Sequence, residues 1–263
     1  YKNLAIQKML EGLKIEDISE IMVRSGLTDE NPLPLKKAAS FRASLTMRMR
    51  QKQLTESLLE WPLDNKATAY KFVDLLKIKR PKTSDQLYSV DNLPYDNGIV
   101  IKPVDGAGSR GVYLVHNENK IIDIKRNTSL DSWDNLKKHM REDLDTGWVS
   151  KDEWFVEELI YEDEKNYIPA RDLKFYCFYG KVGLVLEITR YPERLHSWWT
   201  SEGNSIVTGK YNDDLFKGRG FTNEELEKVE KLSAMIPAPF IRIDFLRSEQ
   251  GLVFGEFTPK PGN

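Results

Sequence analysis

Cysteine, histidine and long apolar runs are all scarce in this sequence of 263 residues, which has one cysteine and three histidines. The single cysteine, Cys177, excludes an internal disulfide and a cysteine-rich zinc site. It lies in an apolar stretch, which favours a buried structural thiol over a nucleophile. The histidines at positions 116, 139 and 196 lack the spacing of metal ligands. Because no apolar run is long enough to cross a bilayer and no disulfide is possible, we expect a cytoplasmic protein without a membrane span.

Charge of one sign is not in excess either, because the formal net charge is −2. This balance gives no reason to expect nucleic acid or another polyanion as a partner of the whole chain. The sequence starts at Tyr1 and has no signal-like apolar stretch at its start. We interpret it as a fragment whose true start is missing. Whether the C-terminal end is truncated stays open, as does the oligomeric state.

The first sixty residues differ in texture from the rest. Apolar residues at helical spacing predict a helical segment over residues 1–60. Its basic stretch, residues 41–54, is interpreted either as a solvated helix face or as a binding surface for an acidic polymer or a membrane. From Trp61 onward helix and strand signals alternate, and the length suits two packed lobes.

Short β-branched and aromatic runs predict strands after Trp61, and capped periodic stretches predict helices. The predicted strands are 99–102, 111–115, 121–124, 154–160, 173–179, 182–189, 241–246 and 252–257. The predicted helices are 64–76, 131–141 and 222–235, with Asp64 or Asn65 and Thr222 or Asn223 as N-caps. Hairpins outnumber β–α–β units, which argues against a Rossmann sheet and indicates an α+β fold.

A glycine-rich loop lies between the first two predicted strands. Lys102 ends the strand before it, and the loop itself contains Gly106, Gly108, Ser109, Arg110 and Gly111. Neither a P-loop nor a dinucleotide fingerprint fits, because a strand and not a helix follows. Glycines let backbone N–H groups approach phosphate oxygens, and the lysine would neutralise their charge. The loop is therefore interpreted as a phosphate-binding flap, with a plain surface hairpin as the alternative.

Two acidic residues occur at matching places in the last predicted hairpin. Period-two alternation puts Arg242 and Asp244 on one face of their strand, and Glu256 occupies the polar phase of the next. Two carboxylates side by side destabilise a sheet unless a cation lies between them. A hard divalent ion, above all Mg²⁺, is the natural partner. The alternative is two unrelated acids on an exposed sheet face.

With these motifs in place, the sequence from about Lys66 to the end resembles the ATP-grasp superfamily. Lys66 looks like the early lysine of the family, Lys102 and the glycine-rich loop match its phosphate clamp, and 155–160 looks like its hinge strand. The segments 172–181 and 255–259 are similar to the TupA-like branch, which is named for teichuronopeptide biosynthesis and found with cell-surface polysaccharide genes.

The resemblance implies an ATP-grasp fold, in which two α+β lobes clasp ATP, preceded here by the N-terminal helical segment. The lobes would be residues 61–155, with the flap, and 156–263, with the hinge and the metal-binding acids. The implied cofactors are ATP and Mg²⁺. The implied nucleotide contacts are Lys66, Lys102, Gly106, Gly108, Ser109, Arg110, Gly111, Glu157, Glu158, Leu159, Ile160, Asp163 or Glu164, Asp172 and Lys174. Metal ligands would be Asp244, Glu256 and Thr258, where Thr258 replaces the asparagine of many ATP-grasp enzymes.

The resemblance also implies a reaction, in which ATP phosphorylates a carboxylate and an amine then displaces phosphate. Lys174, Arg242 and Arg190 would assist by neutralising phosphate and the acyl phosphate. The expected substrates are an amino acid or peptide and a sugar-acid or amino-acid carboxylate. The segment 190–200, aromatic and basic, is interpreted as a substrate-binding segment or as a packed surface loop. The alternatives are an ATP-grasp kinase acting on a hydroxyl and a non-catalytic nucleotide-binding module.

Overall fold

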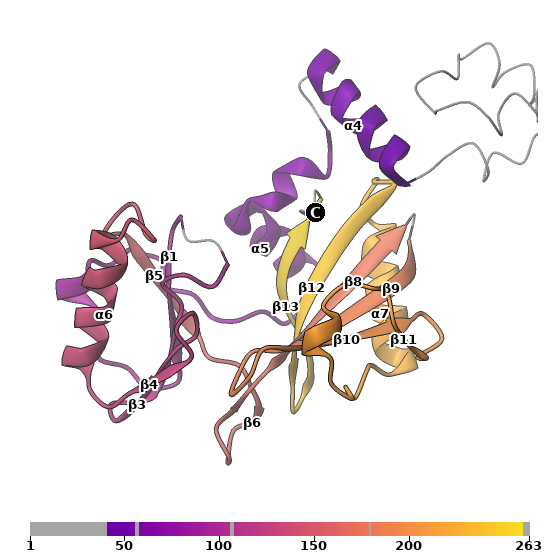
Figure 1. Cartoon of the computed structure of the whole chain (residues 1–263). Helices are drawn as coiled ribbons and strands as arrows, with labels where there is room; N and C mark the ends of the chain where they lie inside the picture. Colours follow the sequence, from indigo (N-terminus) through magenta and orange to yellow (C-terminus); the bar gives the residue numbers. More distant parts are fainter. Residues whose placement is uncertain (1–40, 56–57, 106–107, 179, 260–263) are drawn as a thin grey trace, which may run out of the picture. The chain divides into compact units, whose positions relative to one another are not determined.

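The structure is a computed structural model that describes residues 41–55, 58–105, 108–178 and 180–259. Contacts divide the chain into two units, residues 1–61 and 62–263. In the first unit, α4 (Phe41–Thr55) forms the basic stretch (Figure 1). Its side chains between positions 46 and 54 are mostly exposed, as expected for a solvated helix face. The helical prediction for residues 1–40 lies outside the described residues.

A five-stranded antiparallel sheet comes first in the second unit, with the strand order β4-β3-β2-β1-β5. Its strands are β1 (Ile99–Pro103), β2 (Tyr113–Asn117), β3 (Lys120–Asp123), β4 (Thr128–Leu130) and β5 (Trp154–Glu158). The helix α6 (Trp133–Asp145) packs on it, and Leu136 and Met140 are buried in the same core as Ile101 and Trp154 (Figure 1). The side chain of Ser132 caps α6 by accepting from the N–H of Asn135.

A six-stranded antiparallel sheet follows, with the order β11-β10-β9-β8-β12-β13. Its strands are β8 (Arg171–Phe178), β9 (Lys181–Thr189), β10 (Leu195–Thr200), β11 (Ser205–Ile206), β12 (Phe240–Ser248) and β13 (Gly251–Thr258). Two helices, α5 (Lys66–Leu75) and α7 (Asn223–Ala234), supply side chains to its core. The smaller elements are η2 (Trp61–Asp64), η3 (Val90–Asn92), η4 (Asn212–Asp214), β6 (Tyr161–Asp163) and β7 (Ile168–Pro169).

The α+β prediction is confirmed, as are the helices and longer strands predicted after Trp61. Asn65 caps α5, and Thr222 caps α7 in a capping box with Glu225. The surface-loop alternative for residues 190–200 is wrong in part, because residues 195–200 form the strand β10. Burial of Trp198 between β9 and Tyr211 favours the strand there. No helix of the described ranges is both long and apolar enough to span a membrane.

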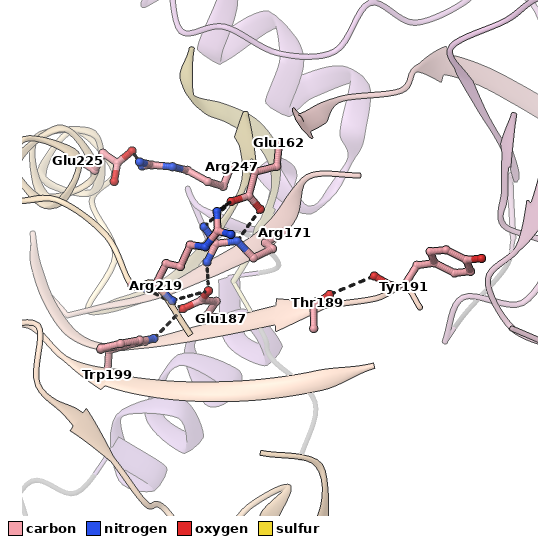
Figure 2. Close-up of polar contacts among 10 residues, drawn as sticks. Glu162, Arg171, Glu187, Thr189, Tyr191, Trp199, Arg219, Glu225 and Arg247 are labelled. Atoms are coloured by element: carbon pink, nitrogen blue, oxygen red, sulfur yellow. Dashed lines mark hydrogen bonds and ion pairs between the residues drawn. The ribbon is translucent and has the colours of Figure 1, made fainter. Parts of the chain in front are cut away.

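A buried charge network lies at β8 and β9 (Figure 2). Arg171 lies between the carboxylates of Glu162 and Glu187, and Arg219 and Trp199 reach the same two acids. Glu187 is fully buried and also accepts from the backbone N–H groups of Arg219 and Gly220, at 3.1 and 2.9 Å. The network therefore fixes the chain that returns from η4 to α7.

Candidate functional site

Three cavities with shared walls lie between the two sheets of the second unit. The largest, of about 520 Å³, has an apolar part that includes Val100, Leu114, Leu159, Ile160, Leu186 and Ile188. A second, of about 140 Å³, is lined by Lys66, Lys102, Glu157, Asp172, Lys174, Arg190, Asp244 and Glu256, among others. A third, of about 380 Å³, lies against Gly108 and Ser109 of the flap. Arg190 lines all three cavities and marks their junction.

Two lysines from distant parts of the sequence share one buried carboxylate. Lys66 opens α5, Lys102 is on β1, and both ammonium groups pair with Glu157 on β5, with Lys66 Nζ 2.5 Å from Glu157 Oε2. Burial alone would raise the pKa of Glu157, but the two ammonium groups outweigh it and hold that pKa below its usual range. Burial and the neighbouring Lys102 charge lower the pKa of Lys66. The two lysines and Glu157 together carry one net positive charge, which suits a phosphate group.

The two acids predicted to be neighbours are register partners, since Asp244 on β12 pairs with Glu256 on β13. Lys174 on β8 and Arg242 both form ion pairs with Asp244, with Arg242 Nε 2.7 Å from Asp244 Oδ1. Burial would raise the pKa of Asp244, but these two cations keep it lowered. Burial and then the Asp244 carboxylate raise the pKa of Glu256, although the Glu256 side chain is 60% exposed. Glu256 therefore lies where a further cation would be stabilised.

The acid pair fits a magnesium ion better than it fits a zinc ion. Among the described residues, no three His, Cys, Asp or Glu side chains gather as a metal cluster. Mg²⁺ is commonly held by one or two carboxylates, with phosphate and water as its other ligands, so two acids beside two lysines are a suitable set of residues. Thr258 has a different partner from the one expected, because its hydroxyl accepts from Arg242 Nη2 at 2.9 Å and does not line the three cavities.

The flap residues have unequal roles. Ser109 Oγ accepts from Arg190 Nη1 at 3.0 Å, and Arg190 Nε donates to Asp172 at 2.5 Å. Gly108, at φ +64°, lines two of the three cavities and has open space where a Cβ would lie. Gly111 is required for packing, because a Cβ there would lie 2.9 Å from Val149 Cγ2.

Arg110 and Gly106 are the remaining predicted residues of the flap. Arg110 lies over the Trp148 ring, 5.9 Å from its centroid, and does not line the three cavities. Gly106 lies outside the described residues.

The residues predicted as the hinge lie beside the largest cavity, but two of their main-chain groups already have partners. Leu159 and Ile160 line the largest cavity directly after β5. The N–H of Leu159 donates to Gly98 O at 2.8 Å, and the carbonyl of Ile160 accepts from Ala170 N at 2.9 Å, so both are engaged within the protein. The Glu158 carboxylate accepts from the N–H of Lys82.

The residues predicted to hold the ribose lie away from these walls. Asp163 caps the turn at Asn166, and Glu164 donates its N–H to Glu249. Neither lines the three cavities, because the β6–β7 turn places them elsewhere.

Sequence reasoning missed some residues of the walls. Tyr176 alternates with Asp172 and Lys174 along β8, so the period of two would have found it. Lys210 and Tyr211 follow no periodic signal and reach the largest cavity from a connection. The 190–200 segment divides, since Arg190 and Arg194 line cavities while His196 is buried, with its ring 4.0 Å from that of Tyr211.

The paired antiparallel sheets, the lysines around Glu157 and the acids of β12 and β13 define an ATP-grasp fold. Residues 43–263 match the family model described as TupA-like ATP-grasp, and the chain belongs to that family. No curated protein has a matching sequence.

Solved structures of ATP-grasp enzymes are similar to this chain. D-alanine–D-alanine ligase from Bacillus anthracis is 16% identical with a TM-score of 0.47, and the match covers 99% of this chain and 82% of that one. D-alanine–D-alanine ligase from Helicobacter pylori is 16% identical with a TM-score of 0.41, and the match covers 76% of this chain and 55% of that one. The ATP-grasp ligase PsnB, complexed with a variant of its precursor, Mg and ADP, is 13% identical with a TM-score of 0.44, and the match covers 84% of this chain and 63% of that one. The chain thus spans little more than half of the Helicobacter pylori enzyme.

Proposed function

We propose that this protein is an ATP- and Mg²⁺-dependent ligase that joins a carboxylate to an amine through an acyl phosphate. One observation carries the proposal. Lys66 and Lys102 around Glu157, the Asp244–Glu256 pair, and Arg190 line the same cavity of about 140 Å³. The cations that would bind phosphate and the acids that would bind the metal therefore face one another across a space that shares walls with a larger, partly apolar cavity.

The nucleotide would lie along the largest cavity and the adjoining cavity of about 140 Å³. The apolar walls at Val100, Leu159 and Ile188 suit an adenine ring. The phosphates would then reach Lys66 and Lys102, with backbone N–H groups near Gly108 as further donors. Phosphate oxygens would replace Glu157 as the partner of at least one ammonium group, because both lysines now share that one carboxylate.

Mg²⁺, when bound by Asp244 and Glu256, would neutralise phosphate charge and fix the phosphates in place. Arg242 holds Asp244 through two hydrogen bonds, at 2.7 and 2.8 Å, so the direction of that carboxylate is set before any ligand arrives. Lys174 shares Asp244 with Arg242. It would turn toward phosphate once Asp244 has a divalent partner.

Arg190 is the residue we assign to the reacting carboxylate and its acyl phosphate. It lies at the junction of the three cavities and is held from both sides, by Asp172 of β8 and Ser109 of the flap. A fixed guanidinium beside the reacting oxygen would stabilise the developing negative charge, and loss of one such donor typically costs about 10²–10³ in rate. Arg242, by contrast, is committed to Asp244, Glu256 and Thr258.

The biological setting is also part of the proposal. The TupA-like family match supports a role in cell-surface polysaccharide synthesis, in which an amino acid or peptide is joined to a sugar-acid or amino-acid carboxylate. We place the reaction in the cytoplasm, on the ground of the single buried cysteine.

A screen of ADP release tests the proposal. Purified protein would be given ATP with pairs of uronic-acid sugars and amino acids, with and without Mg²⁺. We expect ADP and phosphate to appear together, and only when Mg²⁺, a carboxylate and an amine are all present. ADP release with a hydroxyl substrate alone, with the phosphoryl group retained on that substrate, would identify a kinase instead.

A further inference from the structure

The cavity of about 380 Å³ beside the flap carries charges of both signs on its walls. Lys125 comes from the turn after β3, Glu193 and Arg194 from the connection between β9 and β10, and Asp214 from η4. These four side chains are exposed. The volume is at the small end of the roughly 300–1,000 Å³ of ligand pockets.

Four of the charged side chains that line this cavity lack an ion-pair partner among the described residues. Within the described ranges, no ion pair joins Lys125, Arg194, Glu193 or Asp214 to another side chain. Arg190, on the same wall, is already paired with Asp172 at 2.5 Å. Two cations and two anions are thus left facing a space beside the site of phosphoryl transfer.

We propose that this cavity binds the amine substrate of the ligase, and that this substrate is a free α-amino acid held at both ends; the inference rests on the proposed function. A purely anionic ligand would meet the carboxylates of Glu193 and Asp214, and a purely cationic one would meet Lys125 and Arg194. A zwitterion pairs with both sets. The carboxylate of the amino acid faces the two cations, and its ammonium group faces the two acids.

The position of the cavity suits the second half of the reaction. It shares Gly108, Ser109, Arg190 and Arg194 with the largest cavity, so a ligand there reaches the junction at Arg190. The ammonium group gives a proton to Asp214 or Glu193. The neutral nitrogen then attacks the acyl carbon and the C–N bond forms. The C–O bond to phosphate breaks as phosphate leaves with the electron pair, and the nitrogen gives its second proton to the departing phosphate, which leaves a neutral amide.

Calorimetric binding to the full chain, with Mg²⁺ and ADP present, tests the inference without any turnover. The twenty protein amino acids are titrated one by one, and the tightest is compared with its α-carboxamide and its desamino acid. Each analogue lacks one charge. A charge-assisted hydrogen bond contributes about 1.5–3 kcal/mol, so we expect each to bind about 10-fold to 150-fold more weakly than the amino acid.

Two substitutions test which residues bind the carboxylate and which bind the ammonium group of the amino acid. Arg194→Gln is expected to weaken the amino acid about 10-fold and to leave the carboxamide unchanged. Asp214→Asn is expected to weaken the amino acid and to leave the desamino acid unchanged. Arg141→Gln, an exposed arginine on α6, is the matched control and is expected to change neither.

The outcomes separate the inference from the ligase proposal. Binding of no amino acid, equal binding of the desamino acid, or an unchanged affinity in both Arg194→Gln and Asp214→Asn would overturn the inference. Amino-acid binding with the predicted preferences, but without ADP release for any carboxylate, would support the cavity and overturn the ligase.

Discussion

Replacing Glu187 by glutamine removes one charge from the buried network in Figure 2 and keeps the shape of the side chain. The carboxylate now accepts from four donors, which are Arg171 Nη1, Trp199 Nε1 and the N–H groups of Arg219 and Gly220. A glutamine has a single acceptor oxygen, and its amide nitrogen accepts nothing. Two of the four donors therefore lose their partner, at a position that is fully buried.

The expected cost follows from these contacts. An unpaired buried donor costs about 1–3 kcal/mol, and breaking a buried ion pair costs about 3–5 kcal/mol, so we expect a loss of about 3–5 kcal/mol. Arg171 keeps its two hydrogen bonds to Glu162, at 2.6 and 2.9 Å, which limits the loss. At roughly 2–4 °C per kcal/mol for a domain of this size, the melting temperature falls by about 10 °C.

Scanning calorimetry and urea unfolding followed by tryptophan fluorescence would measure this loss. Glu227→Gln is the control, because Glu227 is 68% exposed and lies 3.8 Å from Lys231 in an i,i+4 pair, so its loss should change stability by less than about 0.5 kcal/mol. A Glu187→Gln variant within about 1 kcal/mol of the wild type would refute the reasoning.

Three further predictions concern the site itself. Glu256→Gln should lower turnover by about 10²-fold or more in the ADP-release assay, while stability stays equal or rises slightly, since burial and the Asp244 charge raise the pKa of Glu256. Full activity would remove Glu256 from the mechanism. Glu157 has a lowered pKa, so its ion pairs stabilise the fold above the unfolded-state pKa of about 4.3, and this contribution is lost as the pH falls through the folded-state value. The stability gap between wild type and Glu157→Gln in urea should therefore narrow below about pH 4, and a constant gap would contradict the ion pairs. Gly111→Ala should lower the free energy of unfolding by at least about 2 kcal/mol, because its Cβ would meet Val149. Gly108→Ala, at a similar φ but in open space, should lower it by only about 1 kcal/mol. Equal losses would show that packing at Gly111 is unimportant.

Local pattern predicted the acid pair, but the structure forms this pair through a β-bulge. The alternation puts Arg242 and Asp244 on one face of β12, whereas the register of the hairpin, continued without a shift, would pair Asp244 with Gly255. The register shift between Asp244 and Phe245 skips Gly255 and brings Glu256 opposite Asp244, and a glycine inside a strand is the sequence signal that could have indicated this bulge. The sequence thus predicted the neighbours but not the bulge beside them.

Contacts between residues far apart in the sequence could not be predicted from local pattern. Lys66 and Glu157 are 91 positions apart, and they meet because Lys66, at the start of a helix that packs on the six-stranded sheet, reaches β5 of the other sheet. The sequence placed Glu157 at a hinge, whereas the structure shows it as the shared partner of two lysines. The aromatic residues Trp198 and Trp199 favour a strand at β10, but the basic residues of the same segment are also compatible with a loop.

The central claim is that the lysines and the acids enclose the same triphosphate, and calorimetric binding of a non-hydrolysable ATP analogue tests it most directly. We predict that Lys102→Met weakens binding in Mg²⁺ by about 10-fold or more, whereas Lys138→Met, an exposed lysine on α6, changes nothing. We also predict that Mg²⁺ tightens binding to the wild type but not to Glu256→Gln. An affinity unchanged by Lys102→Met, together with a magnesium effect that survives Glu256→Gln, would contradict the account.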